Sequence, residues 1–185
     1  MRLFLALAPP GAVLDDLDAA CAPFRPARTE LRWTSRVLWH VTLAFLGEVS
    51  EESLARLLPR LELAARRHRA FDLSIAGAGA FPSPARANVL WTGLSGDRKA
   101  LGELAMSVSA AARRAGAPPP DAGRSYRPHV TLARCRPAVD VATIVTGLGG
   151  YQGPTWAAEE IHLISSTLGG QPRYESLGTW KLRTG

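Results

Sequence analysis

A five-residue segment occurs twice in this chain of 185 residues, and it constrains both the fold and the chemistry. His40–Ala44 and His129–Ala133 both read His-Val-Thr-Leu-Ala. β-Strands accept Val, Thr and Leu readily, and alternate side chains of a strand point to opposite faces. Each copy therefore predicts a strand with His, Thr and a small Ala on an open face. Val and Leu, continued in the first copy by Phe45, are predicted to face the core.

The repeat predicts two similar halves that each contribute one His-x-Thr strand to a common cleft. A single His on a strand is more often a hydrogen-bonded structural residue than a catalytic one. Packing explains why Val and Leu recur, but it gives little reason to repeat both His and Thr on the other face. Because two facing imidazoles can act as general acid and general base, His40 and His129 are the candidate catalytic residues.

The composition is that of a soluble globular protein, with 46% hydrophobic and 21% charged residues. No run of about eighteen apolar residues is present, so no membrane span is expected. Met1–Ala8 is interpreted as a first strand rather than a signal peptide, because it soon reaches Pro9 and Pro10. Two cysteines, Cys21 and Cys135, are too few for a disulfide framework, so each is expected to pack as a small hydrophobic residue. This cysteine usage predicts a cytoplasmic location.

The net charge of +6 and the pI near 10.1 would suit a polyanion such as RNA. The total is weak evidence, because the near-absence of Lys beside abundant Arg and Ala is what a coding bias toward G and C produces. The placement of arginine is more informative. Several arginines precede or flank the two repeats: Arg28, Arg32, Arg36, Arg124, Arg127, Arg134 and Arg136. Arginine matches phosphate oxygens well, so an anionic ligand is expected here.

Strands and helices alternate along the chain in a way that predicts an α+β fold. Besides the second repeat, strands are predicted near residues 2–8, 30–34, 38–46, 71–75, 87–92, 159–165 and 173–180, and helices near 11–22, 50–69, 97–115 and 139–148. Short turns between neighbouring strands favour antiparallel or mixed sheets with helices outside. The glycine-rich residues 77–82 fit no phosphate-binding fingerprint and are interpreted as a bulge or turn. The proline-rich loop 116–123 is a candidate rim of the site.

The other two histidines are interpreted as structural. His162 lies on a strand without a repeated motif, and His68 lies at a basic helix end, where positive charge suits the helix dipole. The four histidines show no close metal-ligand spacing, so no metal site is expected.

The repeats and their surroundings resemble a known family, the bacterial RNA 2′,3′-cyclic phosphodiesterases, also called 2′-5′ RNA ligases, of the 2H phosphoesterase superfamily. Phe45-Leu46-Gly47 after the first repeat and Arg127-Pro128 before the second make the resemblance specific. Further matching segments are Met1–Leu7, Arg32–Trp33, Gly77–Pro82, Val89–Trp91, Tyr126–Pro128 and Tyr174–Leu182.

The resemblance implies one domain over residues 1–185, built from two intertwined lobes with pseudo-twofold symmetry. Each lobe would be an antiparallel or mixed sheet with helices on its outer face, and the cleft would lie between the lobes. His40 would be the proton donor and His129 the proton acceptor. Thr42, Thr131 and Arg134 would bind the phosphate, without a metal or cofactor.

The sequence departs from the family pattern at Ser35–Trp39 and at Arg86–Asn88, which concerns how a nucleoside is held. Arg134 raises a geometric difficulty. It lies five residues after His129, so ideal alternation places it on the opposite face. Either the strand ends or bulges there, or Arg134 is not a ligand.

The expected reaction is hydrolysis of RNA 2′,3′-cyclic phosphate ends to 2′-phosphomonoesters, and ligation to a 5′-hydroxyl would be the same chemistry with an alcohol in place of water. One alternative is a 2H enzyme for another small cyclic or 2′-5′-linked nucleotide. A second, of a different class, is a non-catalytic module that binds RNA ends. The expected partners are RNA ends or small cyclic nucleotides, with no membrane, and the protein is expected to be a monomer.

Overall fold

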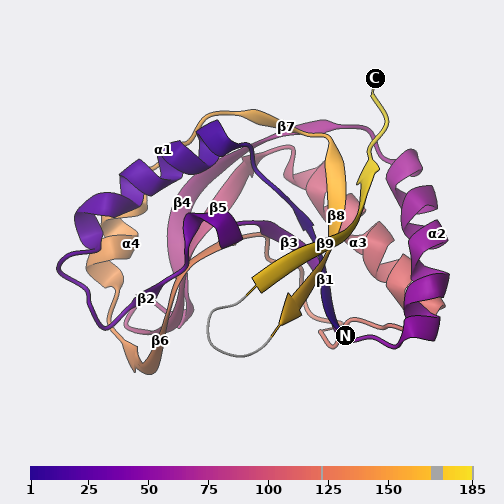
Figure 1. The fold of residues 1–185 in the computed structure, drawn as a ribbon. Helices are drawn as coiled ribbons and strands as arrows, with labels where there is room; N and C mark the ends of the chain where they lie inside the picture. Colours follow the sequence, from indigo (N-terminus) through magenta and orange to yellow (C-terminus); the bar gives the residue numbers. More distant parts are fainter. Residues whose placement is uncertain (122, 168–172, 185) are drawn as a thin grey trace.

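The computed structural model describes residues 1–121, 123–167 and 173–184, and it contains two antiparallel sheets (Figure 1). The first sheet has the order β3-β1-β8-β9, formed by β1 (Arg2–Leu7), β3 (Val41–Glu48), β8 (Glu160–Thr167) and β9 (Arg173–Lys181). The second has the order β2-β6-β5-β4-β7, formed by β2 (Arg32–Trp33), β4 (Phe71–Ser83), β5 (Arg86–Gly96), β6 (Val130–Val139) and β7 (Trp156–Ala158). The predicted α+β fold with two antiparallel lobes is confirmed.

Four α-helices cover the sheets: α1 (Gly11–Cys21), α2 (Glu51–Arg67), α3 (Arg98–Ala115) and α4 (Ala142–Leu148). Figure 1 shows α1 and α4 beside the second sheet, and α2 and α3 beside the first. The helix α1 follows a strand of the first sheet, and α3 follows a strand of the second. The chain therefore crosses repeatedly between the lobes, which intertwines them.

Local sequence signals set the ends of the two long helices. The Ser50 hydroxyl accepts a hydrogen bond from the backbone N–H of Ser53, as expected for a residue that caps α2. The Asp97 carboxylate caps α3 by accepting from the N–H of Ala100 at 2.9 Å. Gly116 ends α3 at a φ of 84°, a left-handed conformation that favours glycine.

The two repeats occupy equivalent places in the two sheets, β3 beside β1 and β6 beside β5. Both strands bulge at the Leu of the repeat. The consecutive residues Ala6 and Leu5 of β1 face Thr42 and Ala44, and Trp91 and Leu90 of β5 face Thr131 and Ala133 in the same way. Leu43 and Leu132 are therefore extra residues, and the side chains after them exchange faces.

Because of the bulges, three residues lie on the opposite face from the one predicted. Ala44 and Ala133 pack in the core instead of leaving room on the open face, and Phe45 leaves the core for a half-buried position. After the second bulge, Ala133 and Cys135 are buried while Arg134 is exposed. Arg134 thus shares a face with Thr131. The bulge is what the sequence analysis required if Arg134 is to be a phosphate ligand.

Other elements follow the sequence with local differences. The glycine-rich residues continue β4 with a register shift between Ala76 and Gly79, so the bulge interpretation is confirmed. The strand β6 extends to Val139, which delays α4 to Ala142, and β7 was not predicted. The predicted hairpin of β8 and β9 is confirmed.

The hydrophobic core joins both sheets to the helices. Cys21 and Cys135 are buried and unpaired within it, as expected for small hydrophobic residues. Within residues 1–121, 123–167 and 173–184, none of the helices combines the length and hydropathy needed to cross a bilayer.

Candidate active site

The two repeat histidines are held in the same way, each directly before its strand. The Nδ1 atom of His40 lies 2.7 Å from the carbonyl oxygen of Leu38, and that of His129 lies 2.8 Å from the carbonyl oxygen of Arg127. Because a carbonyl oxygen only accepts, Nδ1 carries a hydrogen in both rings. The Nε2 atom of each ring is therefore the one that can take up or release a proton.

His40 lies in the more enclosed environment of the two. Its ring stacks on Phe4 at a centroid distance of 4.6 Å and meets the edge of Tyr174 at 5.5 Å. Its Nε2 atom lies 3.0 Å from the hydroxyl oxygen of Thr42. Within the first repeat, His40 and Thr42 are thus hydrogen-bonded to each other on the open face.

His129 is packed against different aromatic residues. Its ring meets Phe81 edge-on at a centroid distance of 5.2 Å and lies 6.2 Å from the ring of Trp91. Within the described part of the chain, its Nε2 atom has no hydrogen-bond partner. A neutral ring in this state presents an unprotonated nitrogen, as a general base requires.

Electrostatic effects connect the two histidines with Arg134. Burial lowers the pKa of His40, and the charges of His129 and Arg134 lower it further, against the opposing effect of the Leu38 carbonyl. Burial also lowers the pKa of His129, with a further contribution from Arg134. Burial raises the pKa of Tyr174, against the charge of Arg134. The charges of His129 and Arg134 in the second lobe therefore affect the protonation of His40 in the first.

Arg134, whose charge affects both repeat histidines, has no acidic partner among the described residues. It faces Arg32 across the β2–β6 pair, and neither arginine forms an ion pair with a described residue. Like charges directly opposite on neighbouring strands are destabilising. An anion bound at Arg134 would relieve this repulsion. The equivalent position in the first lobe is Phe45, and the guanidinium of Arg2 lies 4.8 Å from the centroid of its ring.

The arginines singled out from the sequence separate into two groups. Arg28 binds Glu30 and the carbonyl of Asp140, and Arg36 binds Asp15 and the carbonyl of Gly11, so both have structural partners. Arg127 and Arg124 line a groove of about 1270 Å³ that also contains Thr42 and His129, and Arg124 in addition pairs with Asp121 at 3.4 Å. The loop predicted to form the rim does line this groove, through Pro119, Asp121 and Gly123.

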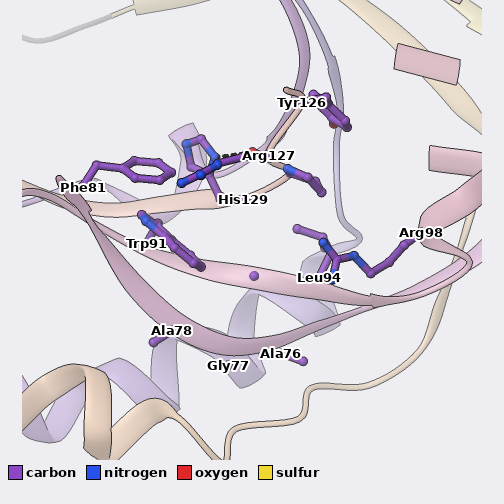
Figure 2. Close-up of a pocket in the computed structure, with 12 residues that line it drawn as sticks. Ala76, Gly77, Ala78, Phe81, Trp91, Leu94, Arg98, Tyr126, Arg127 and His129 are labelled. Carbon is purple, nitrogen blue, oxygen red and sulfur yellow. Dashed lines mark hydrogen bonds between the residues drawn. The ribbon is translucent and has the colours of Figure 1, made fainter. Parts of the chain in front are cut away.

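A second, smaller pocket opens beside His129, with a volume of about 450 Å³ (Figure 2). Its walls include Phe81, Trp91 and Tyr126, and two arginines reach it, Arg98 and Arg127. None of its described lining residues comes from the first repeat.

Among the described residues, His129 is the histidine that lines these two pockets, and His40, His68 and His162 do not. The Nδ1 atom of His162 lies 3.1 Å from the hydroxyl oxygen of Thr179, and His68 ends α2. Burial lowers the pKa of both. Within the described ranges, there is no cluster of three or more His, Cys, Asp or Glu side chains that could hold a metal ion.

Sequence reasoning missed the aromatic residues around the histidines. They are Phe4, Phe81, Trp91, Tyr126 and Tyr174. They come from four strands and one loop, so their convergence depends on the strand order. The available signal was that all five lie in the segments that resemble the known family.

Two equivalent His-x-Thr strands, of which Thr42 and His129 line one groove, are typical of the 2H phosphoesterase class. A family model described as the 2′-5′ RNA ligase superfamily matches residues 13–170. The chain belongs to this superfamily.

Curated relatives and solved structures agree with this assignment. The chain is similar to the protein named RNA 2′,3′-cyclic phosphodiesterase from Aeropyrum pernix, at 34% identity over 75% of this chain and 79% of the relative. The protein of the same name from Escherichia coli K12 is 33% identical over 77% of this chain and 75% of its own length. The structure of TT0787 of Thermus thermophilus matches with a TM-score of 0.83 at 29% identity, covering 100% of this chain and 99% of that one. E. coli LigT in its apo form matches with a TM-score of 0.80 at 29% identity over 98% and 96%.

Proposed function

We propose that this protein hydrolyses RNA 2′,3′-cyclic phosphate ends to 2′-phosphomonoesters, with His40 as proton donor and His129 as proton acceptor. The observation that carries the proposal is the pair of imidazoles from the two lobes. Each has Nδ1 bound to a carbonyl oxygen, and the pKa of His40 responds to His129. The substrate is inferred from the similar proteins named for this activity.

The reaction is an in-line displacement at phosphorus. Nε2 of His129 takes a proton from water, and the water oxygen attacks the phosphorus atom. The bond from phosphorus to O3′ breaks, and Nε2–H of His40 gives its proton to O3′. The product carries a 2′-phosphate, and proton exchange with solvent then returns both rings to their starting states. General acid and general base steps each contribute roughly 10² to 10⁴ in rate.

His40 has to be protonated although burial lowers its pKa in the free site. A bound cyclic phosphate is an anion and favours the imidazolium form, which raises this pKa in the complex. Substrate binding thus prepares the acid. The Thr42 hydroxyl, 3.0 Å from Nε2, holds the ring in position until the O3′ atom accepts its proton.

Three side chains are proposed to stabilise the negative charge on the non-bridging phosphate oxygens. Arg134 supplies a cation without an acidic partner in the described residues, and the half-buried Thr42 and Thr131 supply one hydroxyl donor from each repeat. Preorganised donors of this kind stabilise a transition state because they need no reorientation. The proposed steps use no metal or cofactor.

The test is incubation with an RNA that ends in a 2′,3′-cyclic phosphate, with separation of 2′- from 3′-phosphate products. His40→Ala and His129→Ala should each lower turnover by roughly 10²-fold or more, and the double variant should lose little more because the pair acts as a unit. His162→Ala is the matched control and should retain activity, because His162 is hydrogen-bonded to Thr179 in the β8–β9 hairpin and neither His129 nor Arg134 affects its pKa. EDTA should have no effect.

Three results would count against the proposal. A 3′-phosphate product would mean that O2′ leaves instead of O3′. Turnover that depends on a metal ion would contradict the two-histidine mechanism. RNA binding that survives both substitutions, without turnover in the unmodified protein, would indicate the non-catalytic module. A panel of cyclic nucleotides and 2′-5′ oligonucleotides would reveal an enzyme with another substrate.

A further inference from the structure

Arg32, Arg134 and Arg136 lie together at the β2–β6 edge of the second sheet, and they carry more positive charge than one reacting phosphate balances. We propose that Arg32 and Arg136 bind the phosphodiester on the 5′ side of the terminal nucleoside, so that the enzyme acts on ends of RNA strands in preference to cyclic mononucleotides. This strand subsite rests on the proposed function, because it takes the position of the reacting phosphate, at Arg134, from it.

The strand order places these side chains on one open face. Arg32 of β2 is the register partner of Arg134 of β6, which puts their Cα atoms about 5 Å apart. Arg136 follows Arg134 by two residues, about 7 Å along the strand, and the buried Cys135 between them leaves both arginines exposed. The strand β2 ends the order of this sheet, and Figure 1 shows it beside β6 at the lower left. The arginines therefore border solvent at the rim of the sheet.

No carboxylate of the described residues neutralises this group. None of the three arginines forms an ion pair there. The carboxylates closest to them in sequence are used elsewhere, since Glu30 pairs with Arg28 at 2.7 Å and Asp140 accepts from a backbone N–H at the start of α4. Like charges that face each other across two strands are destabilising. Bound anions would therefore stabilise this edge.

The large groove beside α3 differs from this edge in its charge. Lys99 pairs with Glu103 and Arg124 pairs with Asp121, and all four residues line the groove. Its positive charge is thus partly balanced within the protein. The β2–β6 edge, where the arginines have no such partners among the described residues, is the better match for a polyanion.

The charge of the substrate distinguishes a strand from a mononucleotide. A cyclic phosphate diester carries one negative charge, which Arg134 balances. A nucleoside with a free 5′-hydroxyl adds no charge, whereas each further nucleotide of a strand adds one phosphate. Successive phosphates of an extended strand are separated by about the length of two residues of a β-strand. The phosphate next to the reacting one is therefore within reach of Arg32 and Arg136, whose planar guanidinium groups match phosphate oxygens.

The experiment compares kcat/KM for three substrates with the same cyclic end. They are a nucleoside 2′,3′-cyclic phosphate, a 5′-hydroxyl dinucleotide with a normal internal linkage, and the same dinucleotide with a neutral methylphosphonate linkage. The unmodified protein should prefer the normal dinucleotide to both others. Arg32→Gln and Arg136→Gln should each lower the preference for the normal dinucleotide over the mononucleotide about tenfold, the smaller effect expected for a lost hydrogen bond to a charged group. Neither should change the ratio of the methylphosphonate dinucleotide to the mononucleotide.

Arg114→Gln is the matched control. It removes the same charge from an exposed arginine in the last turn of α3, which lines neither pocket and pairs with no described carboxylate. Its substrate ratios should equal those of the unmodified protein. Added salt should weaken the preference for the normal dinucleotide less in Arg32→Gln and Arg136→Gln than in the control, because fewer counterions are released on binding.

The outcomes separate the two proposals. If the unmodified protein hydrolyses the mononucleotide as efficiently as the normal dinucleotide, the strand subsite is wrong and the proposed function stands. The same holds if Arg32→Gln and Arg136→Gln lower kcat/KM equally for all three substrates, or equally for the two dinucleotides, because the internal charge would then not be what they bind. If none of the substrates is hydrolysed, the proposed function itself fails, and the strand subsite fails with it.

Discussion

At the scale of single residues, His40 and His129 each form an equivalent hydrogen bond to a backbone carbonyl oxygen, but their surroundings differ. His40 is enclosed by Phe4 and Tyr174 and is hydrogen-bonded to Thr42, whereas His129 lines the smaller pocket. Burial lowers the pKa of both rings. The free site therefore favours the neutral form of each, which suits the base and leaves the acid dependent on the bound phosphate.

This dependence predicts different pH profiles for kcat/KM and kcat. The acid limb of kcat/KM marks protonation of His129 and should lie below pH 6.5, near which an unperturbed histidine titrates, because burial lowers its pKa. The alkaline limb marks loss of the His40 proton. It should lie at higher pH for kcat than for kcat/KM, because the bound anion raises the pKa of His40. Steady-state rates from about pH 5 to pH 9 measure both. Coinciding alkaline limbs would show that substrate does not set the protonation of His40.

Arg134 affects the same profile and the rate. Its charge contributes to the lowered pKa of both histidines, after burial, so Arg134→Ala should move both limbs of the kcat/KM profile to higher pH. Turnover should also fall by roughly 10²- to 10³-fold if the guanidinium stabilises the transition state. Arg134→Lys keeps the charge and serves as the control, so its limbs should remain in place while its rate falls. Limbs that do not move in Arg134→Ala would place the arginine outside the site.

At the scale of elements, the sequence predicted the strands and helices well and their faces less well. Pattern alone located both repeat strands, the long helices and the closing hairpin. It could not locate the bulges, because Leu43 and Leu132 suit a regular strand and the extra residue is visible only in pairing with β1 and β5. The site shows the same limit. Both histidines follow from the repeat, but the face of Arg134 depends on the bulge and the surrounding aromatic residues depend on strand order.

The packing of β4 against Trp91 gives a prediction at this scale. Gly79→Ala places a methyl group against the indole and should lower the free energy of unfolding by about 1 to 3 kcal/mol, as overpacking does. Gly102→Ala is the control, because no atom lies within 4 Å of a Cβ at this position in α3. It should be neutral or stabilise the protein by about 0.5 to 1 kcal/mol, since alanine is the better helix former. Urea unfolding measures both, and equal midpoints for the two variants would contradict the packing.

At the scale of the whole molecule, the spacing of the two histidines depends on how the lobes are held together. One hydrogen bond connects the two halves of the site directly. The hydroxyl of Tyr126, just before the second repeat, donates to the carbonyl oxygen of Thr42 in the first repeat at 2.9 Å. Burial raises the pKa of this phenol, so it stays protonated and remains a donor throughout the working pH range.

Removing this bond should affect stability and turnover together. Tyr126→Phe keeps the ring but leaves the Thr42 carbonyl without its donor, which should lower the free energy of unfolding by about 1 kcal/mol. Turnover should fall as well, because the bond fixes the segment that carries His129 relative to the strand that carries His40. Tyr151→Phe provides the comparison, since the Tyr151 hydroxyl donates to Asp16 at 2.6 Å and lines neither pocket. It should alter stability without the loss of turnover, as measured by urea unfolding and by the cyclic-phosphate assay. If both variants retain full turnover, the spacing of the histidines is set by the sheets and the shared core instead of by this bond.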